Sequence, residues 1–183
     1  AAAFEEFLEH GYARGTTASV AQRAGLSKVT LFRYFDSKDA LFEAVIQTHI
    51  ASAAVALQSS PMLEHESVGE YLLRTVGAAA EVIDSSGRSA TARLVIAEGL
   101  EFPLLAQMYR RYVNDALLEH FSRLAQLAAE RGELKAPELI EHPALLLAPL
   151  WMAMMNNTVI HPEVPMNAKT LFQLQVALLF KMP

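Results

Sequence analysis

The stretch that decides the fold runs from Thr16 to Leu41 and reads TTASVAQRAGLSKVTLFRYFDSKDAL. It holds two short helical runs separated by Gly25, which can adopt the positive φ that a tight turn needs. Ala21 precedes this glycine by four residues and is small enough to let a second helix cross closely. The spacing is typical of a helix-turn-helix, a motif whose second helix enters the major groove of DNA.

Side-chain periodicity predicts which faces of this motif are buried. We expect a small core formed by its apolar residues, which are Val20, Ala24, Leu26, Leu31 and Phe35. Because residues three and four apart share a helical face, Thr30, Arg33 and Tyr34 should then face solvent as the reading surface. Thr17 is expected to cap the second helix, and Ser27 to cap a third helix that continues to Phe35.

Outward from the motif, helical periodicity dominates and almost nothing alternates like a strand. The chain is predicted to be all-α, with about nine helices. The first ends at His10-Gly11, and the fourth runs from near Lys38 towards Ser59, before Pro61. Later helices are expected at 66–84, 88–99, 103–131, 138–157 and 167–181, and Ser85-Ser86-Gly87 is one of the breaks. We expect a DNA-binding domain over 1–43 and a second domain over 44–183.

The composition excludes several classes of protein. The 183 residues are 52% hydrophobic and 19% charged, with a formal net charge of −5, which suits one or two soluble domains with a real core. The absence of cysteine excludes disulfide scaffolds, thiolate zinc sites, iron–sulfur clusters and cysteine nucleophiles. The apolar run from Pro143 to Met155 is shorter than a membrane span and is predicted to be a buried helix. No secretion signal is apparent, so we expect a cytoplasmic protein without a membrane partner.

Charge is distributed unevenly along the chain. Residues 11–38 contain five basic residues against Asp36 alone, a local charge of +4, and the remaining residues sum to −9. Neutralisation of DNA phosphates supplies much of the affinity of a small DNA-binding module, so this local charge favours DNA binding. The alternative is an ordinary helical hairpin with a solvated basic surface.

The stretch 16–41, with the preceding His10-Gly11-Tyr12, closely resembles the DNA-binding domain of the tetracycline-repressor (TetR) family. The resemblance includes the Thr-Thr start of the second helix and the Tyr34-Phe35-Asp36-Ser37-Lys38 signature that leads into the fourth. It implies a homodimeric one-component regulator, most often a repressor. Such a regulator binds a palindromic operator through its first three helices and a small effector through its C-terminal helices. Segments around Arg93–Leu105 and Pro137–Trp151 are similar to effector domains of this family.

The same resemblance assigns roles by position. Lys28, Val29, Thr30 and Phe32 match residues that face bases in the family, whereas Thr17, Tyr34 and Lys38 match its phosphate contacts. For Thr17 and Ser27 plain helix capping is an equal alternative, and for Phe32 the alternative is core packing. The chain opens partway into the family's first helix and lacks its basic arm, so we expect either that residues precede Ala1 or that DNA affinity is reduced.

The last two helices are predicted to form a dimer interface. Over 167–181 apolar residues cover almost the whole circumference, and such a helix must be covered on both sides. A second copy of the chain is the simplest cover, giving a four-helix bundle. The expected interface residues are Leu171, Leu174, Gln175, Leu178 and Leu179. A single large monomeric core is the alternative.

Aromatic and methionine side chains predict a site for an apolar or amphipathic effector. The candidate lining consists of Phe102, Leu105, Met108, Tyr109, Tyr112, Phe121, Trp151, Met154 and Met155. Pro149 is expected to lie inside a helix and to bend it, so that this wall of the site moves outward. Polar groups that could orient a ligand are Arg93, Glu98, Asn156 and Asn157. Simple core packing is the alternative for all of them. The fourth helix is expected to act as the lever to the DNA-binding domain.

Two other classes of protein fit less well. The six histidines are scattered, and no metalloprotease motif, nucleophile elbow or phosphate-binding glycine loop occurs, so no catalytic residue, metal or cofactor is expected. A helical adaptor without DNA or ligand would require the predicted recognition helix to be inert.

Overall fold

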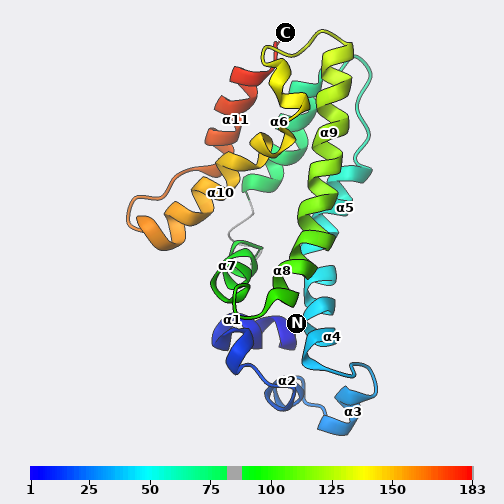
Figure 1. The fold of residues 1–183 in the computed structure, drawn as a ribbon, viewed down its shortest axis with the longest axis vertical. Coiled ribbons are helices and arrows are strands. Elements are labelled where there is room, and N and C mark those ends of the chain that lie inside the picture. The colour runs from blue at the N-terminus through cyan, green and yellow to red at the C-terminus, as the bar shows by residue number, and fades with distance from the viewer. Residues whose placement is uncertain (82–87, 183) are drawn as a thin grey trace. The chain divides into compact units, whose positions relative to one another are not determined.

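The computed structural model describes residues 1–81 and 88–182 of the chain, and helices make up the regular structure of these residues (Figure 1). One isolated antiparallel bridge joins Leu134 to Phe180. The prediction of an all-α fold is confirmed. Contacts divide the chain into unit 1, which comprises Ala1–Ala53 and Gly87–Asn114, and unit 2, which comprises Ala54–Ser86 and Asp115–Pro183.

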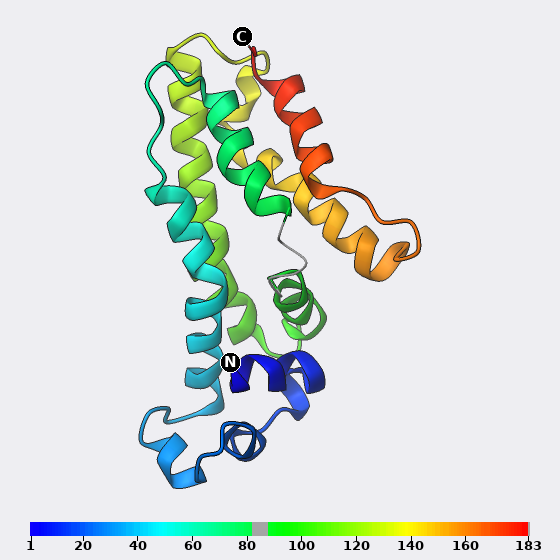
Figure 2. The same ribbon diagram turned by 180° about the vertical axis from the view of Figure 1, so that it is seen from behind.

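Unit 1 contains the N-terminal helices and two later ones. Its elements are α1 (Ala2–Arg14), α2 (Thr17–Arg23), α3 (Lys28–Phe32), α4 (Lys38–Val45), a π-helical turn (Ile46–Ala51), α7 (Arg88–Glu98), α8 (Pro103–Tyr109) and a second π-helical turn (Arg110–Asn114). In both ribbon views α1 lies between α2 on one side and α7 on the other (Figures 1 and 2). Helix α5 (Ser52–Ser59) continues from the first π-helical turn and lies almost entirely in unit 2.

Hydroxyl side chains set the starts of α2, α3 and α4. The N-cap of α2 is Thr16, not the predicted Thr17, and Thr16 and Ser19 form a reciprocal capping box that satisfies two backbone amides. Ser27 caps α3 as predicted, accepting a hydrogen bond from the Thr30 amide at 3.0 Å. Ser37 caps α4 in the same way. Helix α3 ends at Phe32 and does not extend to Phe35, because Arg33 and Tyr34 form a turn.

The helix-turn-helix core is smaller than predicted. Val20, Ala21 and Leu31 are buried and Phe35 is half-buried, but Ala24 and Leu26 are exposed. The prediction that these last two residues are buried is wrong, because they flank the turn at Gly25 and nothing in unit 1 covers it. Gly25 has the expected positive φ, +66°.

Helix α1 is interrupted where the sequence predicted its end. Gly11 has φ +77° and ψ 169°, a conformation that only glycine adopts readily, and a short helical segment follows it to Arg14. Beside this kink, the Phe42 ring packs edge to face against both Phe7 and Tyr12, with ring centroids 5.4 and 5.2 Å apart. Aromatic packing therefore joins α1 to α4.

Unit 2 is built from α6 (Val68–Glu81), α9 (Asp115–Glu130), two 3₁₀ turns (Pro137–Ile140 and Pro143–Leu147), α10 (Ala148–Met155), a π-helical turn (Asn156–Ile160) and α11 (Ala168–Leu179). Helix α11 packs against α6 and α10 (Figure 2). Tyr71, Phe121 and Phe172 are fully buried in the hydrophobic core of unit 2. The predicted end of α6 and its break at Ser85-Ser86-Gly87 lie outside the described residues.

The predicted helix over 138–157 is divided. A turn at Glu141 and His142 separates the two 3₁₀ segments, because Pro143 cannot donate the hydrogen bond that would continue the first. Pro149 stands in the first turn of α10, where a helix needs no amide donor. The prediction that Pro149 bends a helix from inside is therefore wrong.

The run Pro143–Ile160 is long and apolar enough, by length and composition alone, to cross a membrane, with a mean hydropathy of 1.3. Helices in the cores of globular proteins meet the same criteria, so this is weak evidence of a span. Only 33% of the run is buried, since Met152, Val159 and Ile160 are exposed. The prediction of a buried helix from Pro143 to Met155 holds for one face only.

Candidate nucleic-acid interface and ligand cavity

Helix α3 and the turn that follows it present an exposed surface of mixed chemistry. Val29 and Tyr34 are 75% and 76% exposed, and Lys28 and Arg33 are exposed beside them. Phe32 is 39% exposed, with the Lys28 ammonium 5.6 Å from its ring centroid, so the core-packing alternative for Phe32 is wrong. These side chains offer hydrogen-bond donors and apolar groups, which are the chemistry that reads base edges.

Thr17 and Thr30 are more enclosed. Thr30 is half-buried, and its hydroxyl lies 2.8 Å from that of Ser27, so the two share a hydrogen bond at the start of α3. Thr17 is half-buried in the first turn of α2. Its hydroxyl is not needed as the N-cap, since Thr16 has that role.

The basic charge of the motif is partly neutralised by α1. Arg23 forms ion pairs with Glu9, with Glu6 at 3.4 Å and with Glu5 at 3.8 Å. The hydrogen bond from Arg23 lowers the pKa of Glu9, and the same bond raises the pKa of Arg23. The local +4 counted over 11–38 omits these three glutamates, and residues 1–45 contain five basic and six acidic residues. The Arg23 charge is therefore offset by α1, whereas Lys28 and Arg33 are exposed at the motif surface.

Lys38 holds the end of α1 to the start of α4. Its ammonium donates to the carbonyls of Tyr12, Gly15 and Ala13 at 2.8, 3.2 and 3.4 Å. It also lies 4.3 Å from the centroid of the Tyr12 ring. Lys38 thus neutralises the free carbonyls at a helix C-terminus, which is a structural role that the sequence did not predict.

Tyr12 is the residue at which α1, α4 and α7 meet. Glu98, at the end of α7, accepts hydrogen bonds from the amides of Tyr12 and Ala13 at 3.1 and 2.7 Å. The Tyr12 hydroxyl donates to Asp39 in the first turn of α4. Burial first, and then this hydrogen bond, raise the pKa of the Tyr12 phenol. The backbone and the side chain of Tyr12 therefore tie α1 to α7 and to α4.

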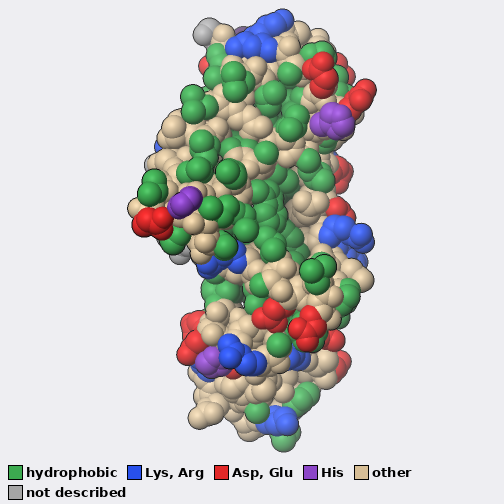
Figure 3. Space-filling model, turned by 60° about the vertical axis from the view of Figure 1, so that its left-hand side comes forward, with side chains coloured by type: hydrophobic (Ala, Val, Ile, Leu, Met, Phe, Trp, Pro, Cys, Tyr) green, Lys and Arg blue, Asp and Glu red, His purple; other side chains and the backbone are tan. Residues whose placement is uncertain are grey.

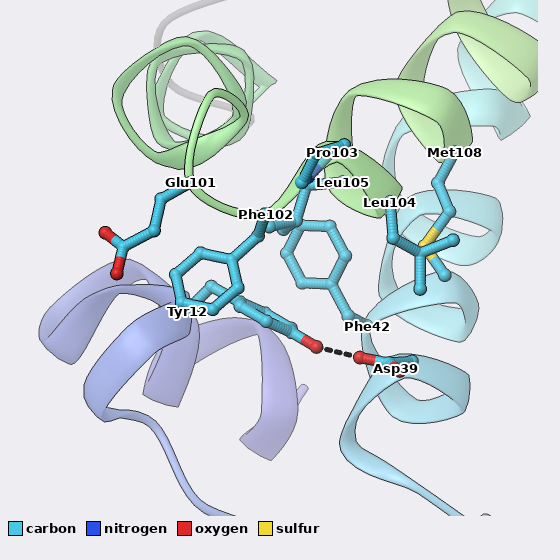
Figure 4. Close-up of a pocket in the computed structure, with 9 residues that line it drawn as sticks. All are labelled: Tyr12, Asp39, Phe42, Glu101, Phe102, Pro103, Leu104, Leu105 and Met108. Atoms are coloured by element: carbon cyan, nitrogen blue, oxygen red, sulfur yellow. Dashed lines mark hydrogen bonds between the residues drawn. The ribbon is translucent and has the colours of Figure 1, made fainter.

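A cavity of about 230 Å³ opens next to Tyr12 within unit 1 (Figure 4). Its walls are the rings of Tyr12, Phe42 and Phe102 and the apolar side chains of Pro103, Leu104, Leu105 and Met108. Asp39 and Glu101 are its charged lining residues, and their carboxylates lie on opposite sides of the Phe102 ring (Figure 4). No lysine or arginine lines the cavity.

The structure brings together three of the nine predicted effector-site residues. Phe102, Leu105 and Met108 line this cavity, whereas Tyr109 and Tyr112 lie elsewhere in unit 1. Burial raises the pKa of Tyr109 to about 12, and the Tyr112 hydroxyl donates to Glu43 at 2.5 Å. The other four belong to unit 2, where Phe121 and Met154 are buried and Trp151 and Met155 are half-buried.

Six cavity residues were missed by sequence reasoning, namely Tyr12, Asp39, Phe42, Glu101, Pro103 and Leu104. Tyr12 comes from α1, and Asp39 and Phe42 come from α4, so no local pattern groups them with the segment 101–108. The polar groups suggested for ligand orientation have other partners: Glu98 binds the amides at the α1 kink, and Asn156 and Asn157 bind the backbone of Val164 and Met166. The Arg93 Nε is buried without a partner among the described residues.

Helix α11 is covered on one face and bare on the other. Phe172 and Val176 are fully buried, whereas Leu174 and Leu178 are 59% and 74% exposed one turn apart. Leu171, Gln175 and Leu179 are half-buried, and the Gln175 amide donates to the Leu145 carbonyl at 2.6 Å. Hydrophobic side chains gather over the part of unit 2 formed by α10 and α11 (Figure 3).

The titratable side chains do not assemble a metal site in the parts of the chain that the structure describes, since no three histidine, aspartate or glutamate residues there could hold one ion. His120 is buried, and its Nε2 lies 3.5 Å from the Tyr71 hydroxyl. Burial, and then the nearby Arg123, lower its pKa.

Two protein-family profiles match the chain. Residues 1–45 match bacterial regulatory proteins of the tetR family, and residues 70–164 match the C-terminal domain of AefR-like transcriptional repressors. Among curated proteins, the nucleoid occlusion factor SlmA of Haemophilus influenzae is 43% identical to this chain over 54 residues. These residues make up 30% of this chain and 24% of SlmA. The transcriptional activator FasR of Mycolicibacterium smegmatis is 43% identical over 27% of this chain and 22% of FasR. These matches span less than a quarter of either relative.

Solved structures resemble the fold over nearly its whole length. GusR of Salmonella enterica superposes with a TM-score of 0.75 at 23% identity, over 97% of this chain and 91% of GusR. The SmeT–triclosan complex superposes with a TM-score of 0.73 at 18% identity, over 98% and 88% of the two chains. The fatty acid degradation regulator FadR of Bacillus halodurans gives 0.68 at 19% identity, over 97% and 93%.

Proposed function

Because the chain belongs to the TetR family of bacterial transcriptional regulators, we propose that it is a ligand-responsive repressor that binds a palindromic operator as a homodimer in the cytoplasm. Residues 1–43 are the DNA-binding domain and residues 44–183 carry effector binding and dimerisation. The observation that carries this proposal is the exposed surface of α3, where an ammonium, a guanidinium and large apolar groups stand free of the core.

The contacts divide into two kinds. Lys28, Val29, Thr30 and Phe32 face bases, because lysine donates to guanine acceptors and apolar groups contact thymine methyls. Arg33, Tyr34 and Lys38 contact phosphates, together with Thr17 and Ser27 at the starts of α2 and α3. Two copies of α3 enter successive major grooves about 34–36 Å apart.

The effector is a small apolar or amphipathic molecule. SmeT, a structural neighbour, was solved with triclosan, and FadR, another neighbour, is a fatty acid degradation regulator. Triclosan is a ligand of SmeT, but its largely apolar chemistry supports an apolar or amphipathic effector here, as do the apolar cavity walls of unit 1. The effector moves α4 and thereby changes the spacing of the two recognition helices, with a coupling of about 1–3 kcal/mol.

Operator selection followed by salt titration tests the DNA-binding part of the proposal. Lys28→Ala and Thr30→Ala should change the preferred base sequence, whereas Arg33→Ala should weaken all operators alike and reduce the salt slope by about one unit. Arg123→Gln, on an exposed turn of α9, is the charge-matched control and should leave binding unchanged. Equal losses on every operator for all three α3 variants would contradict the division into base and phosphate contacts.

Lys38→Ala is a less direct probe of phosphate contact than its position suggests. Its ammonium also holds three carbonyls of the α1 end, so its loss should lower both operator affinity and stability.

A reporter gene downstream of the operator tests whether the protein represses or activates transcription. Expression that falls when the regulator is deleted would indicate an activator and contradict repression.

A further inference from the structure

The cavity of unit 1 combines aromatic rings with carboxylates and has no basic lining residue. We propose that it binds an organic cation with a small apolar body, and that this occupancy weakens operator binding. The effect on operator binding rests on the proposed function as a ligand-responsive regulator. The binding of a cation depends only on the chemistry of the cavity.

The apolar walls set the size and shape of the ligand. Phe42, Leu105 and Met108 line the cavity as buried side chains, while Leu104 is an exposed lining residue. A volume of about 230 Å³ is below the usual range of drug-sized pockets. It suits one aromatic ring with a compact head group.

The carboxylates and rings set the charge. Asp39 lies against the Tyr12 hydroxyl and Glu101 lies on the far side of Phe102, so negative potential falls on both sides of the ring cluster (Figure 4). Ring faces attract an ammonium, and Tyr12 already has the Lys38 ammonium 4.3 Å from its centroid. The Lys38 charge is directed to the carbonyls of Tyr12 and Gly15, so it leaves Asp39 available to a second cation. None of the described lining residues carries a positive charge that would pair with an anion.

The position of the cavity links occupancy to DNA binding. A cation at Asp39 competes with the hydrogen bond from the Tyr12 hydroxyl. The backbone of Tyr12 is held by Glu98 and Lys38, so moving this residue moves the end of α1. That end leads directly through Gly15 into α2 of the helix-turn-helix. The ligand therefore acts on the DNA-binding helices from within unit 1.

Calorimetry with three matched probes tests the charge preference on the full-length protein. Benzyltrimethylammonium should bind at least about fivefold more tightly than 3-phenylpropanol or 3-phenylpropionate, which share its ring but are neutral and anionic. A neutral or anionic probe that binds as tightly as the cation would overturn the proposal.

Variants of the two carboxylates locate the site. Glu101→Gln and Asp39→Asn should each weaken benzyltrimethylammonium binding about fivefold, because each removes one nearby charge and keeps the shape. Glu141→Gln is the control, since it removes one exposed carboxylate from unit 2. Asparagine at position 39 can still accept from Tyr12, and Glu101 is exposed in a loop, so both variants should fold. Undiminished binding by the double variant would overturn the site.

Operator titration with and without benzyltrimethylammonium separates this inference from the proposed function. The cation should reduce operator affinity of the wild type and not of the double variant. Cation binding with unchanged operator affinity would overturn the coupling and support the cavity. If the wild type bound no operator, the proposed function would fail, and the calorimetry would still decide the cavity.

Discussion

His120 shows how one side chain in the core of unit 2 depends on pH. The imidazole is 6% exposed and lies between the rings of Tyr71 and Phe121, with centroids 6.0 and 5.9 Å away. Burial disfavours the charged form, and Arg123 one turn further along α9 adds repulsion. The pKa of His120 is therefore lower in the folded protein than the value of about 6.5 expected when the chain is unfolded.

This shift predicts a loss of stability as the pH falls. At a pH between the lowered pKa of folded His120 and its value in the unfolded chain, the unfolded chain binds more protons. The free energy of unfolding is therefore not reduced by this histidine above pH 6.5 and declines as the pH falls below it. Between pH 7.5 and 5.5, urea denaturation should show a decline in the wild type that is smaller in His120→Gln by up to about 1.4 kcal/mol. His142→Gln, at an exposed position, is the control and should behave as the wild type. Identical pH profiles for wild type and His120→Gln would contradict the assignment.

Within unit 1, the helical geometry of α1 is interrupted at Gly11. At Gly11 the chain leaves helical geometry with φ +77° and ψ 169°, and the amides just after it are held by Glu98. A Cβ at this position would lie 2.3 Å from the Glu98 carboxylate. Gly25 in the helix-turn-helix also has a positive φ, +66°, but a Cβ there would meet nothing within 4 Å.

The two glycines therefore predict unequal effects of the same substitution. Gly25→Ala should cost about 1–2 kcal/mol of unfolding free energy, the strain of a left-handed residue. Gly11→Ala should cost more, about 3 kcal/mol or above, because it adds a clash with Glu98 to a conformation that other residues avoid. Chemical denaturation of both variants checks the order. A Gly11→Ala protein as stable as Gly25→Ala would show that the kink relaxes freely.

At the scale of the whole molecule, the exposed apolar face of α11 favours an interface with another chain. Leu174 and Leu178 expose two large apolar side chains one turn apart on α11, and Met152 of α10 is also exposed. Surfaces of this kind are typical of an interface with another chain. A two-fold related α11 is the simplest cover, since one patch then buries itself.

Leu178→Glu should convert a dimer into a monomer. A charge at the centre of a self-complementary apolar patch faces its own copy across the two-fold axis, so its repulsion and desolvation act on both chains. Sedimentation should give two chains for the wild type and one for the variant, with helical content retained in circular dichroism. Gln173→Glu, which adds the same charge at an exposed polar position of α11, is the control. A wild-type mass of one chain would refute the interface.

The amino-acid sequence by itself determined the local features of this protein. Ser27 starts α3, Gly25 makes the turn and Pro61 follows the end of α5, since caps and backbone preferences act over a few residues. The family was likewise predictable, because its motif is contiguous between Thr16 and Leu41.

Only the tertiary structure decided what distant residues do together. The pairing of Arg23 with the glutamates of α1, which removes charge from the DNA-binding module, depends on how α1 packs on α2. The same holds for Lys38, which holds the end of α1, and for the cavity that Tyr12 and Asp39 share with Phe102. Helical periodicity indicates which face of a helix is apolar but not which other helix covers it. Side chains distant in sequence acquire partners only when their helices pack together.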